Sequence, residues 1–467
     1  MTLTHIFIFA GLGLAGGRFY KTFSRGWLLF VASLLAVFWL QPASLVRTLP
    51  FLLPAASLGL AATIWALTLP EDYRGGREDR WAAGLLGGLI LVVSAARYVE
   101  PVSSLLAVRP PGPEVAVGAV LLISLSAFIA YRLGRGPGVA LNGAVLLIVL
   151  ALVIFKSPPL AAGAGGFLRT LTGQDPGLAS AFDFGWLGFS YIAFRLIHTL
   201  RDRASGRLPQ VSLRDFVTYI VFFPALTAGP IDRVERFQPQ LHTEFILGNE
   251  QLLAAGRRLV TGLFVKFVLA DGLAFFALNA TNAWQVHSPA WAWVLLTAFA
   301  FRIFFDFAGY THIAIGLGLL FGILLPENFD RPYLKPNLTA FWNSWHMSLA
   351  LWFRAYYFNP LTRWLRTRQV QVWLVILIGQ LSTMALIGLW HGITWNFLAW
   401  GLWHGAGLFA HNLWMQFAKV RKCSLSTRLA QPLGVAATFA FVTLGWVWFA
   451  LPAPEDARRM FGLLFGM

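Results

Sequence analysis

The chain has 467 residues, of which 57% are hydrophobic and only 12% are charged. A soluble domain carries about 25% charged residues, so this composition argues against a string of soluble domains and predicts an all-α polytopic membrane protein. The single cysteine, Cys423, excludes a disulfide framework and any site with several cysteine ligands. The net charge of +16 comes mostly from Lys and Arg in short loops, which fits the positive-inside rule better than nucleic-acid binding.

Apolar runs begin at the N-terminus. A helix needs about 20 mainly apolar residues to cross a bilayer. The first run has neither a charged n-region nor a small-residue cleavage site, so we expect a retained helix and not a cleaved signal. The stretch from Ser157 to Asp183 is rich in Gly, Ala and Pro and predicts a loop or re-entrant segment. Before it, the candidate spans are residues 5–17, 26–41, 51–69, 81–99, 114–132 and 138–155.

Further runs follow at 185–200, 213–229, 256–281, 289–324, 371–390, 394–417 and 433–450. The 289–324 run is too long for one upright crossing, so it either forms a long tilted helix or breaks near Gly309. We expect about 11–13 membrane helices plus re-entrant segments. Polar residues within the runs gather after residue 180. This predicts an N-terminal transmembrane scaffold over 1–180, a catalytic core over 181–420, and a C-terminal helix and tail over 421–467.

Two histidines lie in apolar, tryptophan-rich sequence: His346 follows Trp345, and His391 follows Trp390. An ionisable side chain at membrane depth is costly and indicates a functional site. Histidine is also suited to moving a proton near neutral pH. If its segment is helical, Asn343 shares a face with His346 and could orient the imidazole. A structural histidine satisfied by a neighbour is the alternative, and the residues alone favour it for His346.

Charged pairs occur in two other apolar segments. Arg302 and Asp306 are four residues apart, so they can pair on one helix face and either hold the bundle together or take part in the site. Asp232 and Arg233 directly follow the helix-breaking pair Gly229-Pro230. They mark either an ordinary helix end or the entrance of a cavity, where irregular backbone is tolerated.

Four histidines would be enough for a zinc site. They have no His-x-x-x-His pair and no carboxylate near them in the sequence, so we expect no metal. The four are His346, His391, His404 and His411.

Taken together, five motifs resemble those of the membrane-bound O-acyltransferase (MBOAT) family, and most closely its bacterial polysaccharide O-acetyltransferases and teichoic-acid D-alanyltransferases. The resemblance covers roughly residues 185–415 and includes the order of the motifs and the gap between the two histidines. It implies a helical bundle around a central tunnel. The motifs are Ala228-Gly229-Pro230-Ile231-Asp232-Arg233, Phe305-Asp306-Phe307-Ala308-Gly309-Tyr310, Pro326-Glu327-Asn328-Phe329, Phe341-Trp342-Asn343-Ser344-Trp345-His346-Met347-Ser348-Leu349 and Leu389-Trp390-His391-Gly392.

The resemblance also implies roles. His391 matches the family's invariant histidine and would be the general base, while His346 would polarise the acyl carbonyl or assist proton transfer. Ala355 departs from the pattern, because an aspartate is expected after Arg354, so an accessory acid is absent or replaced. Supporting or tunnel residues would be Asn343, Trp345, Ser348, Arg354, Trp390, Asp306, Arg302, Asp232 and Arg233.

The implied reaction moves an acyl group, expected to be acetyl, from a cytoplasmic thioester to a hydroxyl of an extracytoplasmic polysaccharide or cell-wall polymer. The donor would be acyl-CoA or an acyl-carrier protein used as a co-substrate, with no tightly bound cofactor. A periplasmic or extracellular acyl-relay protein is a further expected partner, besides membrane lipid.

Two other functions remain open from the residues. One is D-alanyl transfer to a teichoic-acid-like polymer. The other is a proton-coupled transporter that uses the intramembrane charges, although the chain shows no inverted repeat of the usual transporter kind. Those charges are Lys266, Asp271, Arg302 and Asp306.

Overall fold

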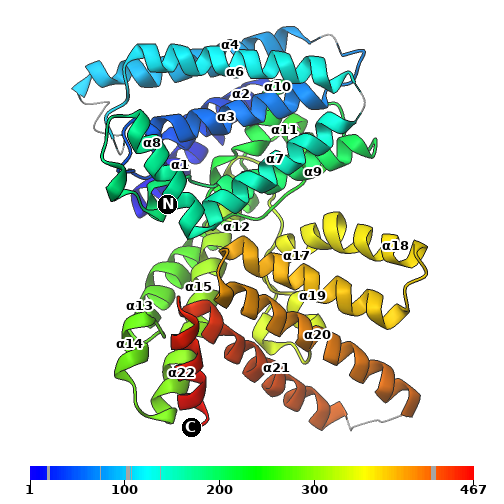
Figure 1. Ribbon diagram of the computed structural model, residues 1–467. Coiled ribbons are helices and arrows are strands. Elements are labelled where there is room, and N and C mark those ends of the chain that lie inside the picture. Colours follow the sequence, from blue (N-terminus) through cyan, green and yellow to red (C-terminus); the bar gives the residue numbers. More distant parts are fainter. Residues whose placement is uncertain are drawn as a thin grey trace. The chain divides into compact units, whose positions relative to one another are not determined.

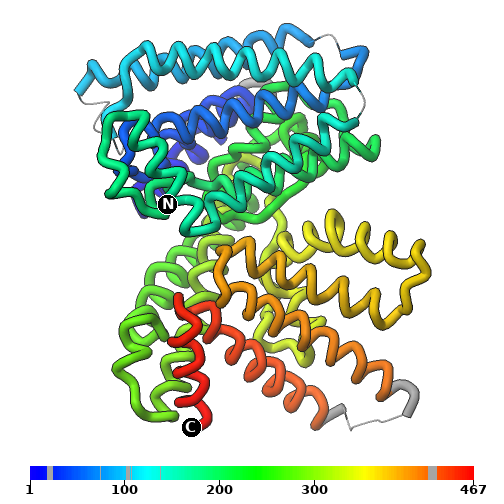
Figure 2. The backbone as a smooth tube through the Cα atoms, in the orientation of Figure 1, coloured from blue at the N-terminus to red at the C-terminus, as the bar shows by residue number. Residues whose placement is uncertain are grey.

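The described part of the chain is mainly helical, as the computed structural model shows (Figure 1). The structure describes residues 1–17, 22–73, 75–100, 106, 108–136, 138–421 and 427–466. Within them, strand-like pairing is limited to one β-bridge between Phe329 and Trp345. The described chain forms two compact units, which can be followed by colour along the backbone in Figure 2. The first unit is Met1–Leu259 with Ile313–Pro326, and the second unit is Val260–His312 with Glu327–Met467.

The first unit holds the N-terminal helices and ends within α12, which crosses into the second unit at Val260. Its helices are α1 (Leu3–Gly17), α2 (Thr22–Trp39), α3 (Leu49–Thr68), α4 (Arg77–Ala95), α6 (Pro113–Gly134), α7 (Val139–Lys156), α8 (Pro158–Leu171), α9 (Phe189–Ala204), α10 (Leu213–Ile220), α11 (Val234–His242) and most of α12 (Asn249–Phe264).

The second unit carries the predicted histidines. It includes two π-helical turns, Val265–Ala270 and Arg354–Phe358. Its α-helices are α13 (Asp271–Ala274), α14 (Ala280–Gln285), α15 (Pro289–Leu320, whose end belongs to the first unit), α16 (Leu338–Trp342), α17 (Met347–Phe353), α18 (Asn359–Thr367), α19 (Val372–His391), α20 (Trp395–Arg421), α21 (Thr427–Ala450) and α22 (Pro454–Leu464).

Seven helices in the described chain are long and apolar enough to cross a membrane: α3, α4 with the turn after it, α6, α7, α15, α19 and the part of α21 from Leu429. Two further apolar helices, Leu3–Gly17 and Arg25–Trp39, are shorter. The all-α membrane fold is therefore confirmed. The count of 11–13 membrane helices stays a prediction.

One local prediction needs correction, and the structure adds detail to two others. The 213–229 run is no spanning helix, because α10 ends at Ile220 and a 3₁₀ turn over Phe223–Ala225 follows. The stretch from Ser157 to Asp183 is not simply a loop: it begins with α8, whose prolines occupy the first helical turn, where a missing N–H costs nothing. Of the two alternatives for the 289–324 run, the structure shows the long helix, α15, and no break at Gly309.

Gly309 serves close packing instead of a break. A Cβ on Gly309 would lie 2.7 Å from the backbone nitrogen of Lys266, in the π-helical turn that follows α12. The glycine therefore lets α15 approach this backbone directly.

Burial separates the core helices of the first unit from those on its periphery. In α3, 72% of the apolar span is buried, whereas the corresponding figures are 11% for α6 and 6% for α7. The apolar side chains of α6 and α7 thus face outward, as expected for helices in contact with lipid. The α3 helix contacts α6, α9 and α10.

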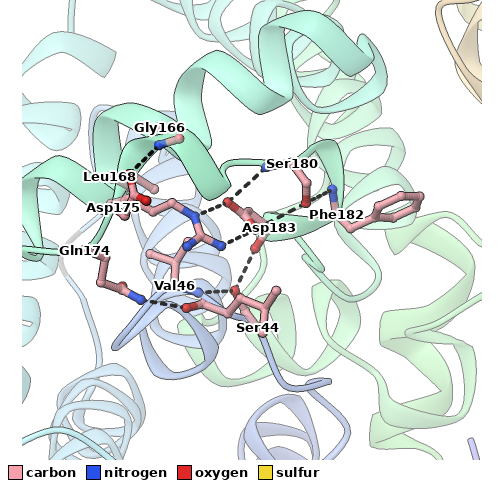
Figure 3. A network of polar contacts seen from close by, with 12 residues as sticks. Ser44, Val46, Gly166, Leu168, Gln174, Asp175, Ser180, Phe182 and Asp183 are labelled. Atoms are coloured by element: carbon pink, nitrogen blue, oxygen red, sulfur yellow. Dashed lines mark hydrogen bonds and ion pairs between the residues drawn. The ribbon is translucent and has the colours of Figure 1, made fainter.

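A buried ion pair ties α8 to the segment that follows it (Figure 3). Arg169 donates Nε and Nη2 to the two carboxylate oxygens of Asp183, at 2.7 and 2.9 Å. The same carboxylate accepts from Ser180, and the Asp183 backbone oxygen accepts from Ser44 Oγ at 2.7 Å. The hydrogen bonds from Arg169 hold the pKa of Asp183 below its usual range.

We expect Asp183→Asn to lower the stability of the protein, because removing one partner of a buried pair leaves an uncompensated charge at a cost of about 3–5 kcal/mol. Since the folded pKa of Asp183 is lowered, the carboxylate stabilises above its unfolded pKa of about 3.9, and this contribution is lost as pH falls through the folded value. Thermal unfolding in detergent should show a lower Tm for the variant at pH 7 and a smaller difference near pH 3. The control is Asp175→Asn, an exposed turn residue that accepts from the Gly177 amide. Equal Tm values for Asp183→Asn and wild type at pH 7 would contradict the assignment.

In the second unit, α19 and α20 run antiparallel in close contact through glycines. A Cβ on Gly388 would lie 2.1 Å from the Phe397 carbonyl oxygen, and one on Gly401 would lie 2.4 Å from that of Met384. The backbones of α19 and α20 are therefore in direct contact, with no side chain between them. This contact at Gly388 lies three residues before His391.

Gly388→Ala should force these two helices apart, since the nearest atom is backbone and cannot rotate away. We expect a loss of about 1–3 kcal/mol in stability, as for other overpacked sites, together with reduced activity. Tm and turnover measure the two effects. Gly143→Ala on α7 is the matched control: nothing lies within 4 Å of its added Cβ, so it should gain slightly from better helix propensity. If Gly388→Ala and Gly143→Ala have the same Tm and turnover, the close approach of α19 and α20 contributes neither to stability nor to activity.

Candidate active site

His346 lies where two segments of the chain pair. Phe329 and Trp345 form the β-bridge, and next to it the Met347 amide donates to the Asn328 carbonyl at 3.0 Å. His346 has φ 43° and ψ 53°, a left-handed conformation, and stands at the N-cap of α17. This conformation costs a residue other than glycine about 1–3 kcal/mol. The pairing on either side therefore holds His346 in place.

Asn328 sets the orientation of the imidazole. Its side-chain oxygen accepts from the Ser348 amide at 3.2 Å and from Ser348 Oγ at 2.6 Å, so a backbone N–H identifies this atom as the oxygen. His346 Nδ1 lies 3.4 Å from the same oxygen, and because that oxygen can only accept, this hydrogen bond forms in the tautomer with the proton on Nδ1. The other nitrogen, Nε2, then presents a lone pair. It is buried and has no hydrogen-bond partner among the described residues.

One cavity of about 40 Å³ contains both predicted histidines in its lining. The space is therefore small and admits only small groups. The lining is otherwise apolar or aromatic: Ile303, Phe307, Trp342, Trp345, His346, Leu349, Ile387, His391, Trp400, Trp446 and Phe449.

His391 is the last residue of α19 and is only half-buried, unlike His346, which is 4% exposed. Its ring lies 4.6 Å from Trp390, 4.9 Å from Phe449 and 5.6 Å from Trp400, measured between ring centres. Trp390 also contacts His346, at 6.3 Å. These three aromatic side chains position the ring of His391. His391 also remains accessible, which His346 does not.

A hydrogen-bonded tyrosine fixes one wall of the cavity. The Tyr333 hydroxyl donates to the Ala300 carbonyl at 2.8 Å and accepts from Trp446 Nε1 at 3.1 Å. Trp446 contacts Trp345, which stacks on Phe341 at 5.6 Å. This chain of contacts places α15, α16 and α21 around the two histidines.

A third histidine lies behind the cavity wall. His404 on α20 is fully buried, and neither of its ring nitrogens has a hydrogen-bond partner in the described part of the chain. Its ring contacts Trp342 at 5.2 Å and Trp400 at 5.0 Å, and both tryptophans line the cavity. From the residues alone, His404 could not be told apart from a histidine that serves only packing.

Two predicted supporting residues lie beside the cavity. Asn343 is exposed and accepts from Arg354 Nη2 at 2.5 Å, so the idea that Asn343 orients His346 is wrong: Asn328 does so. Asn343 and Arg354 line a separate pocket of about 290 Å³, which shares Trp342 and Ile387 with the histidine cavity. The pocket is therefore adjacent to the candidate reaction centre.

The predicted pairing within α15 is also wrong. Asp306 forms its ion pair with Lys266, and Arg302 takes part in none of the ion pairs found among the described residues. The close approach at Gly309 explains this, because it brings the turn that carries Lys266 against α15. Neither Arg302 nor Asp306 lines the histidine cavity.

Asp232 and Arg233 belong to the first unit. Asp232 is 4% exposed and accepts from the Arg233 amide and from Arg236 Nη1, at 2.9 and 3.1 Å. Burial raises the pKa of Asp232, against the opposing effect of Arg236. Arg233 pairs with Glu235 at 3.5 Å. The Gly229-Pro230 break thus leads to a buried aspartate whose charged neighbours Arg233, Glu235 and Arg236 are exposed.

One His/Asp/Glu group in the described residues brings possible metal ligands within 4.8 Å of one another: His198, Asp202 and Glu235, in the first unit. Arg207 already pairs with Asp202 at 2.8 Å, and Arg233 with Glu235. Cations therefore already neutralise both carboxylates. None of the four histidines considered for zinc belongs to this group, and the expectation of no metal stays a prediction.

Comparison with known proteins identifies the family to which a chain with this arrangement of histidines belongs. The family model described as "MBOAT, membrane-bound O-acyltransferase family" matches residues 115–451, which include both histidines. The chain belongs to this family. It is therefore a multi-pass membrane acyltransferase, and acyl transfer replaces transport as its function.

Curated relatives in the MBOAT family carry several names. The chain is 30% identical over 341 residues to "Teichoic acid D-alanyltransferase" of Bacillus subtilis, covering 71% of this chain and 82% of the relative. It is 32% identical over 286 residues to "Probable alginate O-acetylase AlgI" of Azotobacter vinelandii, covering 60% and 53%. It is 33% identical over 261 residues to "Peptidoglycan O-acetyltransferase" of Helicobacter pylori, covering 54% and 47%. The matched part thus spans about half of the two O-acetylating relatives.

Proposed function

We propose that this MBOAT enzyme transfers an acetyl group from a thioester donor to a hydroxyl of an extracytoplasmic polysaccharide or cell-envelope polymer. The single observation that carries the proposal is the cavity lined by both His346 and His391. The names of the relatives given above refer to three different envelope polymers. They support the proposed class of acceptor. In this proposal the donor, acyl-CoA or an acyl-carrier protein, is a co-substrate and no cofactor is tightly bound.

The chemistry needs a base for the hydroxyl and support for the tetrahedral intermediate. His391 takes the proton as the hydroxyl oxygen attacks the thioester carbon. When the intermediate collapses, the C–S bond breaks and His391 returns the proton to the thiolate, so the products are an ester and a thiol. The half-buried position of His391 at a helix end allows an acceptor to reach it.

His346 has the smaller role. With Nδ1 donating to Asn328, its Nε2 can accept a proton or a hydrogen bond but cannot donate one to a carbonyl oxygen. This favours assistance in proton transfer over polarisation of the carbonyl. Trp390 contacts both histidine rings and positions them, Trp345 lines the cavity, and Ser348 acts through Asn328.

The cavity favours acetyl over D-alanyl transfer. A D-alanyl group carries an ammonium, and burying a cation without a carboxylate is costly. The lining has no Asp or Glu to pair with that cation, and the cavity is small. An aromatic wall can bind a cation through its π face, which is the route by which the D-alanyl alternative would operate.

Mass spectrometry of envelope polymers tests the proposal. A deletion strain should lose an ester that returns with the wild-type chain but not with His391→Ala. Acetyl and D-alanyl esters differ in mass, so the same spectra identify the acyl group. An unchanged ester content in the deletion strain would reject the proposed acceptor. A need for a periplasmic or extracellular relay protein would appear as loss of the ester when only that partner is deleted.

A further inference from the structure

The short helix α18 presents a row of arginines to its surroundings. Thr362 and Leu365 face inward and are buried, whereas Arg363, Arg366 and Arg368 are exposed. We call these three residues the arginine face. None of them takes part in an ion pair among the residues that the structure describes. The arginine face therefore has its charge available for a partner outside the described chain.

The sequence around α18 contains no negatively charged residue that could pair with the arginine face. Residues 331–454 contain ten Lys and Arg and not one Asp or Glu. Neighbouring elements of this stretch therefore cannot supply a carboxylate. Acidic residues elsewhere in the described chain form no ion pair with the arginine face, so its charge can attract a negatively charged partner molecule.

The position of α18 in the chain places it at a membrane surface. It ends at Thr367, and the membrane-spanning helix α19 starts at Val372. Trp364 and Trp373 are 54% and 48% exposed, as is common for aromatic residues at the level of lipid headgroups. The Arg368 guanidinium lies 5.3 Å from the centre of the Trp364 ring. An amphipathic helix with arginines and an exposed tryptophan is typical of one that lies in the interface.

We propose that the arginine face binds the phosphate groups of anionic lipids at the membrane surface. Anionic headgroups attract Lys and Arg near the surface by about five-fold in affinity per residue. The adjacent span and the exposed tryptophans favour lipid over an acidic protein as the occupant.

Lipid binding here bears on the active site, a consequence that rests on the proposed function. The backbone stays helical from Met347, the residue after His346, through the π-helical turn Arg354–Phe358 to the end of α18. Asn328 holds one end of this run, through the Met347 amide and Ser348, and lipid holds the other. Anionic lipid then keeps His346 in its position and raises turnover.

The test uses the purified full chain in nanodiscs of phosphatidylcholine, with or without phosphatidylglycerol. The variant is Arg363→Gln/Arg366→Gln/Arg368→Gln. Native mass spectrometry counts the phosphatidylglycerol molecules retained, and acyl transfer is assayed in the same samples. The matched control removes three exposed arginines elsewhere: Arg80→Gln/Arg132→Gln/Arg458→Gln.

The wild type and the control should retain phosphatidylglycerol and be stimulated several-fold by it, and the α18 variant should show neither effect. Equal lipid retention by the wild type and the α18 variant would overturn the proposal. Transfer lost equally in both lipid compositions, with retention unchanged, would also overturn it and would indicate an acidic protein as the occupant. If no sample transfers an acyl group, the proposed function fails, while lipid retention still decides whether the arginine face binds lipid.

Discussion

His391→Ala is expected to abolish acyl transfer while leaving the protein folded and inserted in the membrane. Loss of a positioned general base reduces a rate by about 10²–10⁴-fold. The His391 ring contacts aromatic side chains and is half-buried at the end of α19, so its removal leaves no large void deep in the core. Steady-state transfer assays and size-exclusion profiles in detergent measure the two properties.

His411→Ala is the matched control for this variant. His411 lies on α20, is half-buried, and has its ring nitrogen 3.2 Å from Thr339 Oγ1, but it does not line the histidine cavity. We expect near wild-type transfer from it. Substantial transfer by His391→Ala would contradict the role of His391 as base, whatever the control shows.

Asn328→Leu should lower kcat by about 10²-fold and also reduce stability. The substitution removes the acceptor for the Ser348 amide, Ser348 Oγ and His346 Nδ1, and each lost hydrogen bond costs about 1 kcal/mol or more because the donors stay buried. Without this acceptor the proton of His346 is free to occupy either nitrogen. KM for the donor should change much less than kcat, because Asn328 does not line either pocket.

Two variants separate this positioning role from a purely structural one. Asn328→Asp keeps an acceptor oxygen and should recover part of kcat. Asn337→Ala removes the N-cap of α16, where the side chain accepts from the Ala340 amide at 2.8 Å, and should cost about 1 kcal/mol of stability without a change in kcat. If Asn328→Leu lowers Tm but leaves the kcat of the folded protein unchanged, Asn328 is structural only.

The sequence predicted the fold class and the meeting of the two histidines well, because hydrophobic runs and ordered motifs carry that information directly. The predictions from the sequence were wrong for contacts between segments that are far apart in the chain. Asn328 lies in one of the quoted motifs, but only the pairing of Phe329 with Trp345 shows that its side chain reaches His346. Asn343, three residues from His346, was the natural candidate by helical spacing, yet the chain is not helical across His346.

The charged pair in α15 shows the same limit. Spacing of four residues identifies Arg302 as a local partner for Asp306. The partner that the structure shows, Lys266, comes from another segment, and glycine makes its approach possible. Hydropathy likewise marked 213–229 as apolar without showing that its residues are buried inside the first unit in a short helix and a turn, not in a span.

The size of the histidine cavity also sets a rule for inhibitors. A compound that engages both rings can place only a few heavy atoms between them, since the space is about 40 Å³. The larger pocket of about 290 Å³ is a separate target, with polar contacts at Asn343 and Arg354. A small electrophilic or acceptor group is therefore the shape to synthesise first for the histidine cavity itself.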